Sequence, residues 1–416
     1  MTFKSADILI PKTRDFTSWS VVACDQYTSE PKYWEEVEKI AEGKISAYHL
    51  ILPEIYLEES GVDERIKKVN ETMTKYCSDN IFTEYPNAYF YIERIQRNGK
   101  VRRGIVGAVD LEDYEYTKGS KSAVRATEGT VVERIPPRLK VRMNAKLELP
   151  HVMLLIDDRK KCIIEEIGKH TSDFEKVYDF DLMQNSGHLT GWLINCEWSA
   201  YLENELEKLA ELDAFNEKYD VSESSPLTYA VGDGNHSLAT AKEYYNEMKK
   251  LGKADENSPA RYALAELVNL HDESLVFEAI HRVIFDIDEE NFEKELLAIC
   301  NEGKGEQSFV LVTSKGEKTY SFTSPTANLT VGSIQNFIDS YIKKFGGRVD
   351  YIHGDDVVKE LSSKGNSCGI ILDAMDKNDL FKTVIIDGAL PRKTFSMGDA
   401  CDKRFYNEAR IINTNI

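Results

Sequence analysis

Residues Leu227 to Leu251 read LTYAVGDGNHSLATAKEYYNEMKKL, and they predict a strand, a tight glycine turn and a helix in direct succession. The strand is indicated by an apolar run that ends at Val231. The turn consists of Gly232, Asp233, Gly234, Asn235, His236 and Ser237. The residues after it that recur at helical spacing, and so predict the buried face of a helix, are Leu238, Ala241, Tyr245 and Met248. Asn235 or Ser237 could cap the first turn of that helix.

The predicted turn has the features of a phosphate-binding site. A glycine turn before a helix directs backbone N–H groups and the positive end of the helix dipole at one point, which favours an anion such as phosphate. Gly232 and Gly234 would let the backbone approach the ligand, and Asn235 and Ser237 lie in the same turn. The segment is neither a P-loop nor the GxGxxG dinucleotide motif. A purely structural strand-to-helix turn with a capping asparagine is the alternative.

Two side chains of this turn could take part in chemistry. His236 could donate a hydrogen bond to a phosphate oxygen or transfer a proton near neutral pH. Asp233 could bind a divalent metal ion or accept a hydroxyl proton. The sequence does not identify the metal.

On the N-terminal side of this segment the chain mixes helices and strands. Pro31 and the apolar stripe that ends at Ala41 predict a helix, and Asn98-Gly99 predicts a hairpin with a type I′ turn. Residues Glu112 to Arg142 lose all periodicity and predict a long irregular loop with clustered arginines, which could bind a ligand or simply pair with nearby acids. Trp198 to Tyr219 predicts one long amphipathic helix.

On the C-terminal side, a strand is predicted near residues 275–287, and a new helix starts at Asp288. We therefore place a soft boundary near residue 287. Residues 1–287 would form a main α+β domain with the phosphate-binding strand, turn and helix, and residues 288–416 a smaller α+β domain. A length of 416 residues agrees with more than one hydrophobic core.

Charge and composition exclude several classes of protein. The chain has 52 Lys and Arg against 71 Asp and Glu, and its net charge of −19 argues against a general nucleic-acid binder. The apolar runs are too short to cross a membrane, and the first residues, MTFKSADILIPK, lack the apolar core of a secretion signal. The seven cysteines form no CxxC pair, which fits a reducing compartment. We expect a cytoplasmic protein; the oligomeric state is left open.

The motif Val231 to Ser237 resembles the hallmark of the family known as domain of unknown function 1015, in which A-D-G-H-H-R follows a strand and precedes a helix. The resemblance extends over nearly the whole chain. The further segments that carry it are Arg125 to Glu128, Ala279 to Arg282, Leu390 to Thr394 and Lys403 to Phe405. The motif is also similar to the D-G-x-H-R element of ParB-like and sulfiredoxin-like folds, including the free serine kinases, where it holds nucleotide phosphates.

The resemblance implies a fold and a function. The fold would be a mixed α+β ParB/sulfiredoxin-like core with extra hairpins and helices. The function would be phosphoryl transfer on a small hydroxylated metabolite, most simply a free serine kinase-like or phosphoserine-acting enzyme that uses Mg²⁺ and a nucleotide, ADP or ATP. Two positions depart from the hallmark, because Asn235 replaces its first histidine and Ser237 its arginine. Ser237 cannot form the bidentate phosphate clamp of an arginine.

The residues expected in such a site follow from the motif. Asp233 or Glu128 would act as base or metal ligand, and His236 would stabilise the transferred group. Arg125 and Arg282 are the candidates to replace the missing arginine. The loss of that arginine also favours an alternative, a non-catalytic nucleotide- or metabolite-binding regulatory protein. A third reading, a ParB-like DNA-binding or nuclease protein, is disfavoured by the net charge of −19.

Three other features have open interpretations. Asp25 could be a second carboxylate of the site or a residue of an ordinary turn. His281 could be a structural histidine in its apolar strand, which is the favoured interpretation, or a catalytic one. A basic cluster near the C-terminus could bind an anion or only balance charge; it comprises Arg392, Lys393, Lys403 and Arg404.

Overall fold

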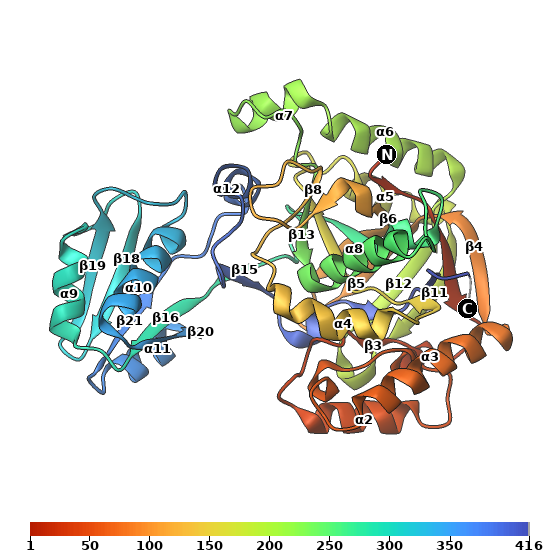
Figure 1. The fold of residues 1–416 in the computed structure, drawn as a ribbon. Helices are drawn as coiled ribbons and strands as arrows, with labels where there is room; N and C mark the ends of the chain where they lie inside the picture. Colours follow the sequence, from red (N-terminus) through yellow and green to blue (C-terminus); the bar gives the residue numbers. More distant parts are fainter. Residues whose placement is uncertain (415–416) are drawn as a thin grey trace. The chain divides into compact units, whose positions relative to one another are not determined.

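The computed structural model describes residues 1–414 and divides the chain into two compact units (Figure 1). The first comprises Met1–Leu275 and Asp399–Ile416, and the second comprises Val276–Gly398. Both contain helices and strands, so the predicted mixed α+β class is confirmed. The division differs from the boundary that the sequence suggested at residue 287. The second unit begins at residue 276, and the last residues of the chain return to the first.

The first unit is built on a ten-stranded mixed sheet with the order β11-β12-β5-β6-β14-β10-β13-β8-β7, to which β1 adds beside β6. The strands are β1 (Phe3–Lys4), β5 (Phe90–Ile95), β6 (Val101–Asp110), β7 (Tyr114–Glu115), β8 (Val124–Ala126), β10 (Met153–Ile156), β11 (Glu175–Asp181), β12 (His188–Leu193), β13 (Tyr229–Asp233) and β14 (Tyr262–Asn269). Strand β13 runs parallel to β8 and antiparallel to β10. The ends of β8 and β13 therefore meet the start of β10 at one edge of the sheet.

Eight helices of this unit connect or cover the strands within the described residues. They are α1 (Phe16–Trp19), α2 (Pro31–Ala41), α3 (Val62–Ser78), α4 (Ile135–Arg142), α5 (Ile164–Gly168), α6 (Cys196–Leu209), α7 (Leu212–Tyr219) and α8 (Asn235–Lys250). The predicted helix at Pro31 and the strand–turn–helix of β13 and α8 are confirmed. Helix α4 lies beside α8 (Figure 1).

Three local predictions were wrong. The predicted long helix over 198–219 is interrupted at Ala210, where α6 ends, and α7 follows it. The predicted irregular loop over 112–142 contains β7, β8 and α4. The hairpin between β5 and β6 is present, but of its two central residues only Gly99 has a positive φ, so the turn is not type I′.

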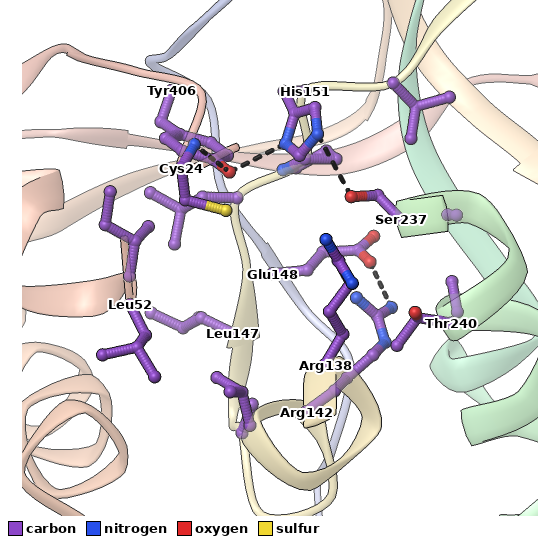
Figure 2. A pocket seen from close by; sticks show the side chains of 18 of the residues that line it. Cys24, Leu52, Arg138, Arg142, Leu147, Glu148, His151, Ser237, Thr240 and Tyr406 are labelled. Atoms are coloured by element: carbon purple, nitrogen blue, oxygen red, sulfur yellow. Dashed lines mark hydrogen bonds and ion pairs between the residues drawn. The ribbon is translucent and has the colours of Figure 1, made fainter. Parts of the chain in front are cut away.

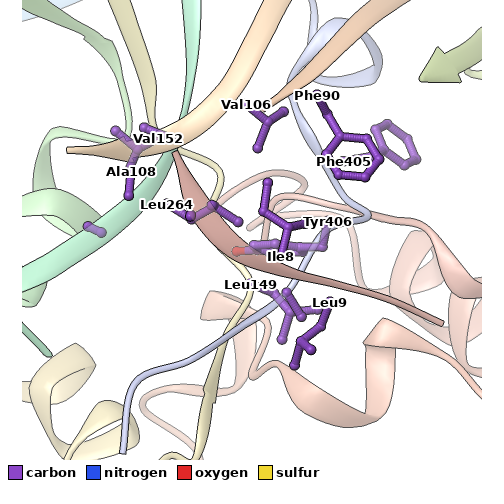
Figure 3. Close-up of a cluster of buried hydrophobic side chains, with 14 of the residues drawn as sticks. Ile8, Leu9, Phe90, Val106, Ala108, Leu149, Val152, Leu264, Phe405 and Tyr406 are labelled. Atoms are coloured by element: carbon purple, nitrogen blue, oxygen red, sulfur yellow. The ribbon is translucent and has the colours of Figure 1, made fainter. Parts of the chain in front are cut away.

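The C-terminal segment belongs to the first unit because it pairs and packs there. Strand β23 (Phe405–Tyr406) pairs with β3 (Val21–Val22), and β24 (Arg410–Ile411) pairs with β9 (Leu147–Glu148). Phe405 and Tyr406 lie in a buried apolar cluster with residues of β6 and β14 (Figure 3). Arg404 forms buried ion pairs with Glu266 and Glu408. A further pair of strands, β2 (Ala6–Pro11) and β4 (Phe82–Ala88), completes the unit.

The second unit has an antiparallel six-stranded sheet with the order β17-β19-β18-β21-β16-β20. Its strands are β16 (His281–Phe285), β17 (Cys300–Glu302), β18 (Ser308–Thr313), β19 (Gly316–Phe322), β20 (Arg348–Ile352) and β21 (Ser367–Ile371), with a separate pair of β15 (Phe277–Ala279) and β22 (Phe395–Met397). Its helices are α9 (Glu289–Leu297), α10 (Thr330–Phe345), α11 (Asp355–Ser362) and α12 (Asp379–Asp387). Within residues 1–414, no helix has the length and apolarity that a membrane span requires.

Candidate active site

The junction of β13 and α8 leaves backbone donors open. Gly234 is the N-cap of α8 and adopts a left-handed conformation with φ of 79°. No side chain caps the helix, so the expected capping by Asn235 or Ser237 does not occur; Asn235 is instead the first helical residue. The first N–H groups of a helix have no acceptor within it. The amides of Asn235, His236 and Ser237 are therefore available to an anion in this part of the structure.

The two glycines of the turn are required by packing. A Cβ on Gly232 would lie 2.7 Å from Cγ of Leu155 in β10, which is too close for any side chain. A Cβ on Gly234 would lie 3.1 Å from the backbone Cα of Val152, in addition to the cost of its positive φ. Both glycines thus let β13 lie against β10, and this places the start of α8 beside the residues before β10.

His151 is the centre of the site, and the sequence analysis missed it. It is buried immediately before β10, with Nε2 3.1 Å from the Ser237 hydroxyl and 3.4 Å from a carboxylate oxygen of Asp25. Its Nδ1 lies 2.7 Å from the hydroxyl of Tyr406 (Figure 2). Asp25 and Ser237 thus share one ring nitrogen of His151, and Tyr406 holds the other. This differs from a hydrolase triad, in which the carboxylate and the hydroxyl occupy opposite nitrogens.

Asp25 and His151 stabilise each other as a charged pair. Burial disfavours the protonated form of His151, but the charge of Asp25 outweighs it, so the pKa of His151 is raised. Burial likewise disfavours the ionised form of Asp25, but His151 outweighs it and the pKa of Asp25 is lowered. Asp25 is presented by a turn after β3, where the amide of Gln26 donates to the carbonyl of Ala23. The position of Asp25 beside His151 therefore agrees with the interpretation of Asp25 as a second carboxylate of the site.

Three predicted residues lie at or after the last residues of the parallel strands β8 and β13. Asp233 ends β13 and forms an ion pair with Lys403 at 3.2 Å. Glu128 follows the neighbouring parallel strand β8, two residues after its last residue, and is half-buried. His236 accepts a hydrogen bond at Nε2 from the amide of Val131, in the loop that Glu128 enters.

His236 is a neutral group at pH 7. Burial and the nearby charges of Arg138 and Arg134 lower its pKa to about 4. Because Nε2 accepts a hydrogen bond from Val131, the neutral ring carries its proton on Nδ1. His236 can therefore offer a neutral N–H donor to a ligand, and it does not supply a positive charge.

The two arginines expected as a clamp are engaged elsewhere. Arg125 donates to the carbonyls of Ser122 and Ser225, which precede β8 and β13, so its guanidinium lies toward the opposite ends of these strands. Arg282 belongs to the second unit, where its buried guanidinium donates to the carbonyl oxygens of Arg392 and Lys393. Among the described residues, Lys403 forms an ion pair with Asp233 of the turn, and Arg134 and Arg138 lie near His236.

A cavity of about 150 Å³ opens beside Ser237 and His151 (Figure 2). Arg138 and Arg142 of α4 line one side and form ion pairs with Glu54 and Glu148. The other walls are largely apolar; they include Leu52, Met73, Leu147 and Leu149. The thiol of Cys24 also lines the cavity, and burial raises its pKa to about 12, so it is not a nucleophile at neutral pH.

The carboxylates at the turn fit a magnesium ion only in the presence of phosphate. In residues 1–414, the group of side chains close enough to share a metal by themselves consists of Asp399, Cys401 and Asp402, and it includes neither Asp233 nor Glu128. Mg²⁺ is commonly held by one or two carboxylates together with phosphate oxygens and water. Asp233 therefore suits Mg²⁺ bound to a nucleotide.

The chain is similar to one described family and to several solved structures. The model of the family "Protein of unknown function (DUF1015)" matches residues 6–341. No curated protein matches the chain. A free serine kinase in complex with AMP is 10% identical, with a TM-score of 0.37 and coverage of 74% of this chain and 90% of that chain. A conserved hypothetical protein from Pyrococcus furiosus is 12% identical, with a TM-score of 0.35 and coverage of 74% and 94%. SbnI with a C-terminal truncation from Staphylococcus aureus is 9% identical, with a TM-score of 0.35 and coverage of 74% and 83%.

Proposed function

We propose a function for this chain from one premise: it belongs to the DUF1015 family, whose model matches residues 6–341. The function is phosphoryl transfer between a nucleotide, ADP or ATP, and a small hydroxylated metabolite. The observation that carries it is the uncapped start of α8 next to the Asp25–His151 pair. Donors for phosphate at the start of α8 thus lie close to the Asp25 carboxylate, which contacts the same nitrogen of His151 as Ser237 does.

The phosphate groups would be bound by the open amides of Asn235, His236 and Ser237. Lys403 supplies the positive charge that the missing arginine of the family hallmark would have provided. The Nδ1–H of His236 adds a neutral donor. In phosphoryl transfer the protein mainly positions the reactants and stabilises charge on the migrating group, and these donors do both.

Asp233, with Glu128 at the end of the neighbouring strand, would hold Mg²⁺. When bound, the ion neutralises charge on the phosphate oxygens. Lys403, which pairs with Asp233, keeps that carboxylate oriented toward the turn.

The hydroxyl of the metabolite would lie beside Ser237 and His151. Asp25 stays ionised at neutral pH because His151 lowers its pKa. It would therefore accept a hydrogen bond from the hydroxyl and orient it, and would take up the proton only as the bond to phosphorus forms. His151 holds Asp25 in place, and Tyr406 holds His151 through its other nitrogen. The resemblance to free serine kinases makes serine the first acceptor to test.

The test is transfer of labelled phosphate by the full chain. Labelled ATP or ADP with Mg²⁺ and L-serine, or another small hydroxylated acid, should give a labelled phosphate ester. Asp25→Asn should lower the rate by about 10²–10⁴-fold, the usual contribution of a proton acceptor. The matched control, Asp79→Asn, changes an exposed carboxylate at the end of α3 and should leave the rate unchanged.

The presence of Ser237 in place of arginine favours a second candidate, a nucleotide-binding regulatory protein without turnover. Nucleotide binding with no transfer to any acceptor would support that candidate against the enzyme. A chain that binds no nucleotide at all would overturn both.

A further inference from the structure

The turn before α8 has an arginine beside it whose side chain is not used by the fold. We infer that Arg134 binds the second phosphate group of the nucleotide, so that the site selects nucleoside diphosphates and triphosphates over monophosphates. This inference rests on the proposed function, because it assumes that a first phosphate group is bound by the open amides of α8.

Arg134 is positioned by its backbone next to the side chain of His236. It ends the short 3-10 helix η4 (Val132–Arg134), which directly precedes α4. Val131, just before this helix, donates its amide to Nε2 of His236 at 3.3 Å, and its carbonyl accepts a hydrogen bond from the amide of Arg134. The charge of Arg134 also contributes to the lowered pKa of His236, which agrees with a guanidinium close to this ring. His236 therefore has the open amides of α8 at its backbone and Arg134 near the far end of its ring.

The side chain of Arg134 has no partner in the folded chain. It is exposed and forms no ion pair or hydrogen bond with any side chain of residues 1–414. The two arginines of α4 that line the cavity, Arg138 and Arg142, are instead paired with carboxylates. A planar guanidinium offers a fork of N–H donors that matches two oxygens of one phosphate group. Arg134 can therefore bind phosphate without first breaking a contact of the protein.

The charges around the turn show why a second phosphate group needs Arg134. Lys403 is paired with Asp233, so this pair adds no net charge to the turn. His236 is neutral at pH 7, because its pKa is lowered to about 4. Glu133, next to Arg134 in the sequence, is exposed and forms no ion pair with it. Of the cations near His236 in the described part of the chain, Arg134 is thus the one whose charge no carboxylate neutralises.

The test is a calorimetric titration of the full chain, with Mg²⁺ present, by ADP, AMP and inorganic pyrophosphate. Arg134→Gln should raise Kd for ADP and for pyrophosphate by about tenfold to a hundredfold, the usual effect of losing a hydrogen bond to a charged group. Kd for AMP should change by less than about twofold, because AMP has no second phosphate group and the remaining effect of an exposed charge is screened.

Two further variants separate a direct contact from general effects of charge. Arg14→Gln, the matched control, removes another exposed arginine without an ion pair, and it should leave every Kd unchanged. Arg14 lies just before α1, which packs on β11 at the opposite edge of the sheet from β8. Arg134→Lys keeps the charge without the fork, so its Kd for ADP should lie between those of the unchanged chain and Arg134→Gln. Thermal unfolding should be the same in all of them, since neither arginine has a side-chain partner.

The outcomes separate this inference from the proposed function. An unchanged Kd for ADP in Arg134→Gln, or an equal loss of affinity for ADP and AMP, overturns the inference even where phosphoryl transfer is observed. A loss for ADP and pyrophosphate but not for AMP, without transfer to any acceptor, supports the inference and overturns the proposed enzyme. A chain that binds none of the three ligands overturns both.

Discussion

Substitution of Gly234 by alanine should damage both the stability and the activity of the first unit. The residue has φ of 79°, and a Cβ there would lie 3.1 Å from the backbone Cα of Val152. In the left-handed conformation an alanine destabilises the folded state by about 1–2 kcal/mol. Alanine also lowers the conformational entropy of the unfolded chain, which stabilises the protein by about 0.4–1 kcal/mol. The close contact adds about 1–3 kcal/mol, because a backbone atom cannot move away cheaply. We expect Gly234→Ala to lower the free energy of unfolding by about 2–4 kcal/mol.

The matched control is Gly252→Ala, just beyond the other end of α8. Gly252 has φ of 66°, but a Cβ there would meet nothing within 4 Å. It should lose only about 1 kcal/mol, as measured by urea unfolding of both variants. Gly234→Ala should also reduce phosphoryl transfer by about 100-fold, since displacement of the amides misplaces the phosphate. Equal losses of stability in the two variants would refute the packing argument, and full activity of folded Gly234→Ala would refute the placement of the phosphates.

Two further predictions concern charge. The folded chain takes up a proton on His236 at a pKa of about 4, whereas the ordinary pKa of a histidine side chain is about 6.5. The unfolded state therefore binds more protons between these values, and the free energy of unfolding should fall as the pH is lowered from 6.5 to 4. His236→Gln should flatten this dependence in urea titrations, and an unchanged slope would contradict the lowered pKa. Arg404→Met should cost about 3–5 kcal/mol, because it leaves Glu266 and Glu408 buried without their cation. Lys208→Met, which removes an exposed pair with Glu205, should cost less than about 1 kcal/mol; similar losses would argue against a structural role of the buried network.

Local patterns in the sequence predicted the strand, turn and helix at the candidate site. The succession of β13, turn and α8 followed from apolar periodicity and two glycines, and it places Asp233 at the end of the strand and His236 in the first turn of the helix. The motif also indicated the family. What the pattern could not show is that Gly232 is required by Leu155 on a neighbouring strand, since that contact depends on how β13 pairs with β10.

Asp25 was named from the sequence as a possible second carboxylate of the site, but its contact with His151, which only tertiary structure creates, could not be predicted. His151, Asp25 and Tyr406 are far apart in sequence, and the pairing of β3 with β23 is what places Tyr406 beside Cys24 and His151. A histidine at the start of the apolar run of β10 was the one available signal. Lys403 was named only as part of a basic cluster that could bind an anion, and its pairing with Asp233 could not be predicted because that residue lies in a distant strand.

Helix α4 was missed for a local reason. Its first turn contains Pro136 and Pro137, and two adjacent prolines suggest a loop. Proline is nevertheless tolerated in the first turn of a helix, where the backbone N–H has no partner. The helix carries Arg138 and Arg142, which line the cavity. Because the helix was not predicted, this side of the cavity was not predicted either.

The binding of phosphate at the start of α8 is tested most directly by a crystal structure of the full chain grown with ADP and Mg²⁺. We predict that a phosphate group of ADP accepts hydrogen bonds from the amides of Asn235, His236 and Ser237, with Lys403 nearby. Ordered ADP bound at another place in the chain, with these amides contacting only solvent, would contradict it.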